Sequence, residues 1–107
     1  MSFRVSDMSI QLAAMLRPHV PRIRARDKSL AEQLVRAANS IALNIGEGWP
    51  SDPGNQRSRF FTAAGSAGEV TQAVRLAVAW GHVPSEDGRH LLALLNRISA
   101  ILWRLTR

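Results

Sequence analysis

The sequence predicts an all-α protein, an antiparallel up-down four-helix bundle that fills residues 1–107 as a single domain. Four segments repeat apolar residues with the 3.6-residue period of an amphipathic helix, and no segment alternates with the two-residue period of a strand. Prolines and glycines break this pattern at 18–21, 48–55 and 81–88. Because short connections favour antiparallel neighbours, this order of segments predicts an up-down bundle.

The first helix is expected over about residues 6–17. Ser6 or Asp7 can act as its N-cap, because their side chains accept hydrogen bonds from free backbone N–H groups. Pro18 ends or kinks the helix near this point, since proline has no N–H. The apolar face of this helix is formed by Met8, Leu12, Met15 and Leu16.

The second helix is expected to begin near Asp27 or Ser29 and to continue to about Glu47. Gly48 suits a left-handed C-terminal stop, and Pro50 prevents the helix from continuing. One side of this helix is lined by Leu30, Leu34, Ala37, Ala38, Ile41 and Ile45.

The third helix is expected after Asp52, which can cap it, with Pro53 in the first turn. Gly81, followed by Pro84, repeats the stop signal of the second helix. The fourth helix is expected from about Ser85 to the end of the sequence. The apolar stripe of the third helix is Phe60, Ala63, Ala67, Val70, Val74 and Ala77, and that of the fourth is Leu91, Leu94, Leu95, Ile98, Ile101, Leu102 and Leu105.

The composition limits the classes of function. The formal net charge is +6, and all but one of the fourteen basic residues are arginine. Such a charge suits a nucleic acid or another polyanionic partner, although arginine is also what a high-GC genome places on an ordinary solvated surface. The sequence has no cysteine for a disulfide, no membrane span and no stretch of signal-peptide type. We therefore expect a cytoplasmic protein with no membrane contact.

Polar residues follow one edge of the apolar stripe on the second and third helices. At about 100° per residue, Asn44 lies about 40° and Glu47 about −20° from Ser40 around the helix. Ser66 and Glu69 occupy a similar flank of the third helix. If the two helices are antiparallel neighbours, the two polar bands can meet.

Three interpretations of these bands stay open. They can form a structural hydrogen-bond network, a subunit interface, or a catalytic or metal site in which Glu47 and Glu69 pair. A di-metal bundle normally adds a Glu-x-x-His pair, which is missing here, and the three histidines lack ligand spacing. There is also no nucleophile–base set and no phosphate-binding loop. We expect no catalytic residue, no metal ligand, no cofactor and no enzymatic activity.

Two segments carry a resemblance to a known family. "RAANSIALNIGEG" (36–48), followed by "RFFTAAGSAGEV" (59–70), resembles the two signature helices of the four-helix bundle protein family, also called the 23S rRNA intervening-sequence protein family. The resemblance covers about residues 21–81. Gly46 departs from it, since alanine is common there. The matching residues are Arg36, Ala37, Ser40, Ile41, Asn44, Ile45, Glu47, Gly48, Phe60, Phe61, Ala63, Gly65, Ser66 and Glu69.

This resemblance implies an antiparallel four-helix bundle that forms homo-oligomers, notably rings of five. Some members are encoded inside insertions of the large-subunit rRNA gene. A related branch serves diversity-generating retroelements as accessory proteins that bind nucleic acid and a reverse transcriptase. No enzymatic activity or catalytic residue is established for the family. The resemblance thus implies the bundle fold more firmly than it implies a pentamer or an RNA or DNA partner.

Our first hypothesis is an oligomeric protein that contacts nucleic acid through basic surfaces. Such cations would contact phosphates and carry no sequence specificity themselves. In an antiparallel arrangement, the group before the second helix and the group that opens the third would lie at opposite ends. The three scattered tryptophans argue against a binder that works by base stacking. The candidate contacts are Arg22, Arg24, Arg26, Lys28, Arg57, Arg59, Arg97 and Arg104.

The alternative is a scaffold or adaptor for another protein, with no nucleic-acid role. Trp49, Trp80 and Trp103 suggest it, because tryptophan is favoured at interface hot spots. The identity of such a protein partner is not given by the sequence. A helix-turn-helix DNA reader is disfavoured, because no glycine turn interrupts residues 29–45.

Overall fold

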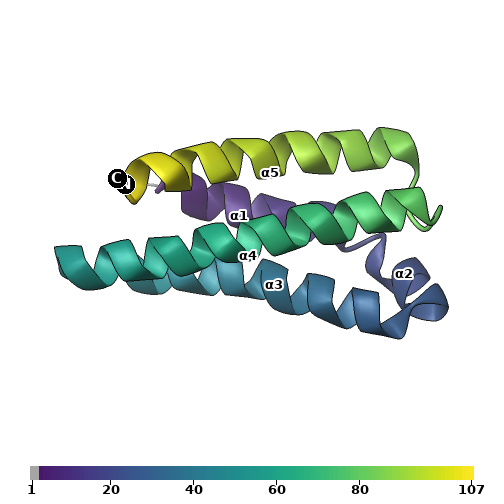
Figure 1. Cartoon of the computed structure of the whole chain (residues 1–107), viewed down its shortest axis with the longest axis horizontal. Helices are drawn as coiled ribbons and strands as arrows, with labels where there is room; N and C mark the ends of the chain where they lie inside the picture. The colour runs from purple at the N-terminus through teal and green to yellow at the C-terminus, as the bar shows by residue number, and fades with distance from the viewer. Residues whose placement is uncertain (1–2) are drawn as a thin grey trace.

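The computed structural model describes residues 3–107, which form five α-helices and no β-strand (Figure 1). The all-α prediction is therefore confirmed for this part of the chain. Residues 1 and 2, which the single-domain prediction includes, lie outside the described residues. The helices are α1 (Arg4–Leu16), α2 (Val20–Arg26), α3 (Lys28–Gly48), α4 (Pro53–Ala79) and α5 (Ser85–Leu105).

Four long helices lie side by side along a body that measures 42 × 23 × 22 Å (Figure 1). Helix α1 packs against α3 and α5, and α4 packs against the same two helices from the other side. The short helix α2 lies at one end, against α3. The core therefore fills the space enclosed by α1, α3, α4 and α5.

The core is built from the apolar stripes that the sequence predicts. All six predicted residues of the second helix and all six of the third are buried. Met15 and Ile101 are half-buried, and Leu105, in the last turn of α5, is exposed. Burial of each large apolar side chain contributes about 1.5–3 kcal/mol, so these stripes dominate the stability of the fold.

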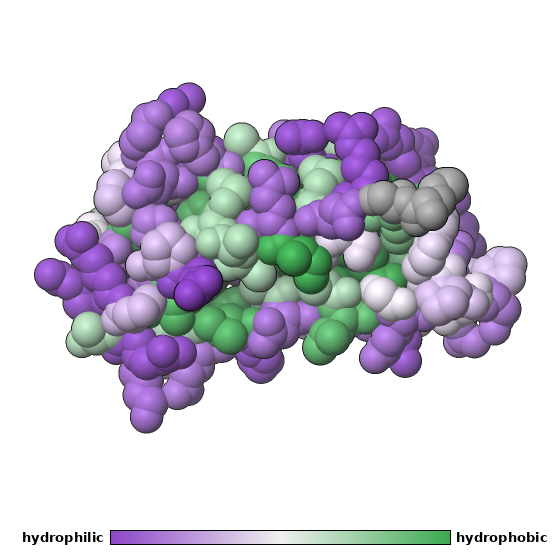
Figure 2. Space-filling view, turned by 180° about the vertical axis from the view of Figure 1, so that it is seen from behind, coloured by the Kyte–Doolittle hydropathy of each residue, from purple (hydrophilic) through white to green (hydrophobic). Residues whose placement is uncertain are grey.

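The apolar surface is not confined to the core. Figure 2, which shows the molecule from behind, has a band of apolar side chains along the middle of this face, between hydrophilic rims. Ile10 of α1 and Leu43 of α3 are 62% and 64% exposed. A hollow of about 350 Å³ between α1, α2 and α3 is lined mainly by apolar side chains. The α1–α3 side therefore leaves apolar area uncovered in the single chain.

The start of α1 differs from the prediction. The helix begins at Arg4 with Phe3 as N-cap, and no side chain caps it, so the proposed caps Ser6 and Asp7 are wrong. The added turn buries Val5 completely, and the ring of Phe3 stacks on Trp49 with centroids 3.9 Å apart. Packing thus outweighs the local capping preference.

Helix α2 (Val20–Arg26) was not predicted; it begins inside the expected break at 18–21 and continues to the start of α3. Pro21 lies in the first turn of α2, where its missing N–H is not needed. Ile23 is the one buried residue of this seven-residue helix and anchors it on α3. A single buried position produces no periodic signal, which is why the pattern of apolar residues did not reveal it.

Gly48 and Gly81 both match the sequence signal for the end of a helix, but they have different roles in the structure. Gly81 has a φ of 80° at the end of α4, as predicted, and the N–H of His82 donates to the carbonyl of Ala77 at 2.8 Å. Gly48 is the last residue of α3 and does not have a positive φ, so the predicted left-handed stop is wrong. A Cβ on Gly48 would lie 2.9 Å from Cβ of Arg59 and 3.0 Å from the Phe60 ring. Gly48 is therefore needed for the close approach of α3 to α4.

Aspartates cap both central helices. The side chain of Asp27 accepts from the N–H of Leu30 at 3.0 Å, and Asp52 accepts from the N–H of Asn55 at 3.1 Å. The side-chain amide of Asn55 also donates to Asp52. These bonds from the backbone and then the side chain of Asn55 lower the pKa of Asp52. The predicted starts of these two helices are confirmed.

Candidate functional site

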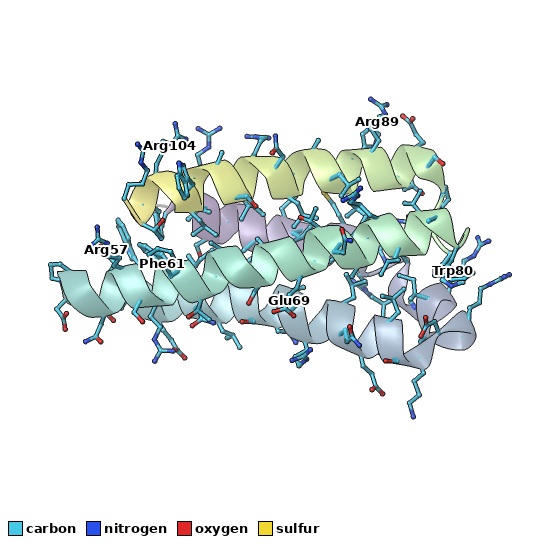
Figure 3. All side chains as sticks on the ribbon, in the orientation of Figure 1. Arg57, Phe61, Glu69, Trp80, Arg89 and Arg104 are labelled. Carbon is cyan, nitrogen blue, oxygen red and sulfur yellow. The ribbon has the colours of Figure 1, made fainter. Side chains whose placement is uncertain are left out.

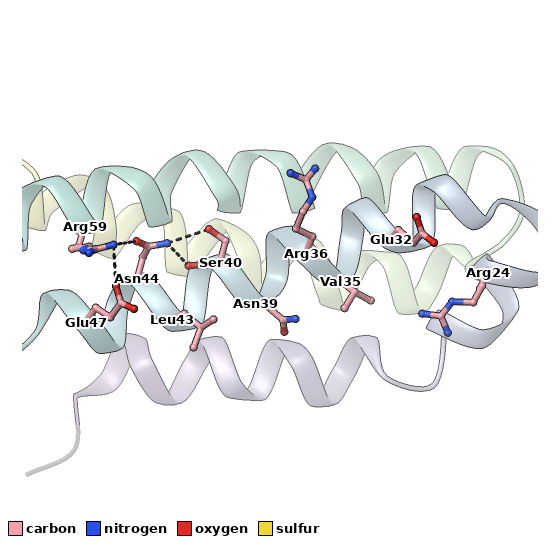
Figure 4. Close-up of a pocket in the computed structure, with 10 residues that line it drawn as sticks. All are labelled: Arg24, Glu32, Val35, Arg36, Asn39, Ser40, Leu43, Asn44, Glu47 and Arg59. Carbon is pink, nitrogen blue, oxygen red and sulfur yellow. Dashed lines mark hydrogen bonds and ion pairs between the residues drawn. The ribbon is translucent and has the colours of Figure 1, made fainter.

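The outer face of α3 carries a hollow of about 630 Å³ (Figure 4). Its floor is the exposed side of α3, with α4 along one edge and α1 along the other. Arg24 of α2 lies at one end and Arg59 of α4 at the other. The polar motif residues of the second helix, Arg36, Ser40, Asn44 and Glu47, line this hollow, so it is the place to test them.

Two serines join α3 to α4 at the edge of the hollow. The hydroxyl of Ser66, which is 6% exposed, donates to Oγ of Ser40 at 2.7 Å. The side-chain amide of Asn44 donates to the carbonyl of Ser40 at 2.8 Å and to its Oγ at 3.1 Å. Each buried hydroxyl therefore has a partner, as a polar group beside a core requires.

Arg59 extends this network to the surface. Its Nη1 donates to Oδ1 of Asn44 at 3.4 Å and lies 2.9 Å from Oε2 of Glu47 (Figure 4). Both charged side chains are more than half exposed, so the ion pair contributes about 0–1 kcal/mol. Ser66, Ser40, Asn44, Arg59 and Glu47 form one continuous chain of polar contacts, called the α3–α4 polar chain below.

Glu69 does not join the α3–α4 polar chain. It is exposed and borders a separate hollow of about 200 Å³ between α3 and α4 (Figure 3). Within residues 3–107 no hydrogen bond or ion pair reaches its carboxylate. Helices α3 and α4 run in opposite directions from the Ser40–Ser66 contact, so Glu47 and Glu69 lie on the order of 15 Å apart. The two carboxylates are too far apart to act as an acid–base pair.

The described part of the chain also lacks a metal-ligating cluster. No group of three His, Cys, Asp or Glu side chains among residues 3–107 could hold a metal ion. The histidines lie elsewhere: His19 is 3.8 Å from Asp87, and His90 is 3.6 Å from Glu86. The geometry of the α3 face thus supports a polar seam between helices.

The candidate basic residues fall into groups at the two ends. Arg24 lies on α2 with Arg22 and Arg26, beside Lys28 at the first turn of α3. Arg57 and Arg59 lie at the start of α4, at the opposite end of the body (Figures 3 and 4).

Helix α5 adds to the second of these groups. Arg104, in the last turn of α5, lies at the same end as Arg57 (Figure 3). Nε of Arg57 donates to the carbonyl of Thr106 at 3.1 Å, which ties the start of α4 to the end of α5. Arg97 lies two turns before Arg104 on the same helix.

Most of these cations have no anionic partner among residues 3–107. Of the eight candidates, Arg59 is the one that forms an ion pair among the described residues. Glu86, the other carboxylate paired with an arginine, binds Arg89 of its own helix. The seven remaining cations are exposed and free to contact an anion from outside.

The sequence did not identify two features of this surface. Leu43 lies exposed in the α3 hollow on the side of α1, and Phe61 is 57% exposed beside the buried Phe60 (Figures 3 and 4). Phe61 lies outside the buried stripe of α4, and its position off the apolar pattern is the signal that could have identified it as a surface residue. None of the helices in residues 3–107 combines the length and apolar character needed to cross a membrane.

These features define a small all-helical protein whose motif residues join two helices at a polar seam. The chain belongs to the 23S rRNA-intervening sequence protein family, whose model matches residues 2–104. A solved structure from Bacteroides thetaiotaomicron VPI-5482, described as a protein of unknown function from the S23 ribosomal protein family, shares the fold. It aligns with a TM-score of 0.87 and 18% identity over 96% of this chain and 98% of that one. No curated protein sequence matches this chain.

Proposed function

We propose that this protein is a non-enzymatic, oligomeric, antiparallel up-down four-helix bundle that associates with RNA or DNA through its basic surfaces. The observation that carries the proposal is the set of seven exposed cations without an anionic partner in residues 3–107. The net charge of +6 favours a polyanion in the same way. The family name refers to 23S rRNA intervening sequences, which supports RNA as the partner.

The bundle topology is supported by the arrangement of the long helices. Helices α1 and α4 each pack between α3 and α5, and the chain reverses direction at each connection between long helices (Figure 1). The basic groups of α2 and of the α4–α5 end therefore lie about one bundle length apart in a single chain. A ring of subunits would repeat both groups around its circumference and raise the field that attracts a polyanion.

Self-association is supported by the apolar area on the α1–α3 side. Ile10 and Leu43 are each more than 60% exposed there, and the adjacent hollow is lined mainly by apolar side chains. Contiguous exposed apolar surface on a soluble domain marks interaction sites. By the family resemblance, we propose a ring of five.

The test is purification at low salt followed by light scattering and titration of a labelled RNA. We expect a mass about five times the 11.8 kDa of one chain. Binding should weaken steeply with salt, by about 10³–10⁵ between about 50 and 200 mM if 6–10 phosphates are contacted. An affinity that stays constant with salt would refute contact with phosphates.

A charge variant gives the matched control. Substitution of Arg22, Arg24 and Arg26 by glutamine removes three unpaired cations, so the salt slope should fall by about 0.9 per lost contact on duplex DNA. Arg89→Gln removes a cation already paired with Glu86 and should change the slope least. Equal salt slopes in the wild-type protein, the triple variant and Arg89→Gln would show that α2 is not part of the binding surface.

A protein scaffold remains the second candidate, because Trp80 is 70% exposed at the end of α4. Exposed tryptophans are enriched at protein interface hot spots. Recovery of a stoichiometric protein partner that contains no nucleic acid, and that is lost in Trp80→Ala, would favour this candidate over the first.

A further inference from the structure

A second groove lies between α4 and α5, away from the α3 face. It has a volume of about 460 Å³. No carboxylate lines it, and small or polar side chains form most of its walls. The lining residues are Gly68, Thr71 and Arg75 from α4 and Leu92, Asn96 and Ser99 from α5.

Gly68 contributes no side chain to the floor of this groove. A Cβ built at Gly68 would meet no atom within 4 Å, so packing does not require a glycine there. This contrasts with Gly88, further along the same seam, where a Cβ would collide with Val78. The groove is therefore an open stretch of a seam that is tightly closed at its other end.

Two exposed aromatic residues, Phe61 and Trp103, lie beyond the lining of the groove, toward the end of α5. The bond from Arg57 to the Thr106 carbonyl sets the register between the helices. Phe61 is one turn further along α4, and Trp103 is one turn back along α5, so the two residues lie at similar levels. Phe61 is seven residues before Gly68 and Trp103 is four residues after Ser99, so each shares a helix face with a residue that lines the groove. They are 57% and 60% exposed. The ring contacts of residues 3–107 are Phe3–Trp49 and Phe3–Phe60, so neither ring has an aromatic partner.

The indole ring of Trp103 makes a cation–π contact with the guanidinium group of Arg107. The guanidinium carbon of Arg107 lies 5.5 Å from the centroid of this ring. Arginine and nucleobases both pair with the face of tryptophan, and both occur together at single-stranded nucleic-acid sites. The accessible ring face is therefore available to a base that displaces or covers the arginine.

The charge around the groove suits phosphates. Residues 88–107 contain four arginines and no aspartate or glutamate. Arg57 and Arg104 lie at the aromatic end (Figure 3), and Arg75 lies at the other. Glu69, the one acidic residue within α4, lies on the α3 side. A strand along the groove would meet cations at both ends.

We propose that the α4–α5 groove binds single-stranded nucleic acid, with bases stacked on Trp103 and Phe61 and phosphates held by the arginines around them. Tryptophans scattered along the sequence argued against base stacking, but the fold supplies a second aromatic residue from another helix. A duplex keeps its base faces stacked on each other, so it cannot use these rings. This inference rests on the proposed association with nucleic acid and specifies its site and the form of its ligand.

The experiment compares two tryptophans with similar exposure on opposite ends of the molecule. Binding of a fluorescein-labelled oligouridylate of about 12 nucleotides is measured for the full chain and for Trp103→Ala and Trp80→Ala. Trp80 is 70% exposed and lies far from the aromatic end of the groove (Figure 3). We expect Trp103→Ala to weaken binding about 5- to 150-fold and Trp80→Ala less than about twofold.

Three further readouts separate stacking from other roles. Trp103→Phe should restore most of the affinity, because a phenyl ring still stacks. Trp103→Ala should keep the wild-type salt slope, because an indole contacts no phosphate. In the Trp49→Phe/Trp80→Phe protein, fluorescence of Trp103 should be quenched by the oligouridylate and not by a duplex of the same length.

Equal losses in Trp103→Ala and Trp80→Ala would overturn the stacking site while leaving salt-dependent binding, and hence the proposed function, intact. A change of oligomeric mass in Trp103→Ala would assign this face to contact between copies and overturn the proposal. If the wild-type chain binds neither single strands nor duplex at low salt, both the stacking site and the proposed function are refuted.

Discussion

On its α3 side, α4 is held by the α3–α4 polar chain, whereas on its α5 side it borders an open groove. The first seam satisfies the hydroxyl of Ser66 with Ser40 and brings the helices together at Gly48. The second leaves Phe61 and Trp103 exposed beside unpaired arginines. Substitutions on the α3 side should therefore change the free energy of unfolding, and those on the α5 side should change binding.

The largest difference is expected between two adjacent phenylalanines. Phe60 is 1% exposed and packs at the close approach of α3 and α4, while its neighbour Phe61 is 57% exposed. Phe60→Ala should lower the free energy of unfolding by about 3–5 kcal/mol, because it leaves a cavity. Phe61→Ala should change it by no more than about 0.5 kcal/mol. Urea denaturation measures both, and similar losses would contradict the contrast between the two sides.

The next effect concerns the glycines of α3. Gly48→Ala should lower the free energy of unfolding by about 1–3 kcal/mol, because its Cβ would collide with Arg59 and Phe60. Gly46→Ala, where a Cβ meets no atom within 4 Å, should raise it by about 0.5–1 kcal/mol. Thermal unfolding of the two variants should show melting temperatures that move in opposite directions. A fall in both would indicate that Gly46 packs against another chain.

The polar chain gives an effect of intermediate size. Ser40→Ala removes the acceptor of the buried Ser66 hydroxyl and should lower the free energy of unfolding by about 1–3 kcal/mol. The Ser40→Ala/Ser66→Ala double variant should lose less than the sum of the two single variants, since no hydroxyl is then left without a partner. Additive losses in this double-mutant cycle would show that the two serines are not coupled.

The ion pair at the surface end should have a smaller effect. Glu47→Gln should lower the free energy of unfolding by no more than about 1 kcal/mol, because both partners are more than half exposed. The difference from wild type should shrink at high salt, as charges in solvent are screened. Denaturation at low and high salt measures it. A loss that persists at high salt would indicate that Glu47 is buried by another subunit.

The smallest effect is expected at the N-cap of α4. Hydrogen bonds from Asn55 lower the pKa of Asp52, so its folded-state pKa lies below the unfolded value. The stability it provides is present above the unfolded pKa, about 3.9, and is lost as the pH falls through the folded pKa. A titration of the Asp52 carboxyl followed by NMR should show the lowered value. Asp52→Asn, which can also cap, should remove this pH dependence while keeping the helix start.

Much of the fold could be predicted because periodic apolar residues report directly on buried faces. The stripe of α3, the start of α3 near Asp27 and the cap Asp52 needed no tertiary information. Two elements of the fold depended on contacts distant in sequence. The N-terminal turn of α1 includes Phe3, which stacks on Trp49, and residue 48 must be glycine because Arg59 and Phe60 leave no room for a Cβ.

The candidate sites were predictable to different degrees. The spacing of Ser40 and Asn44 placed them on one edge of α3, which allowed their meeting with Ser66 to be anticipated. Glu69 has the same local pattern, but it lies one turn further along α4, where it borders a separate hollow and does not reach the polar chain. The shared binding site proposed for Phe61 and Trp103 depends on the register between α4 and α5, which no short motif encodes.

The most direct test of the contrast between the α3 side and the α5 side of α4 is the affinity of two variants for the labelled oligouridylate. It is measured at low salt on protein that circular dichroism shows to be folded. Ser40→Ala, on the α3 side, should bind as tightly as the wild-type chain despite its lower stability. Trp103→Ala, on the α5 side, should bind about 5- to 150-fold more weakly at unchanged stability. Weaker binding by Ser40→Ala with wild-type affinity in Trp103→Ala would contradict the account.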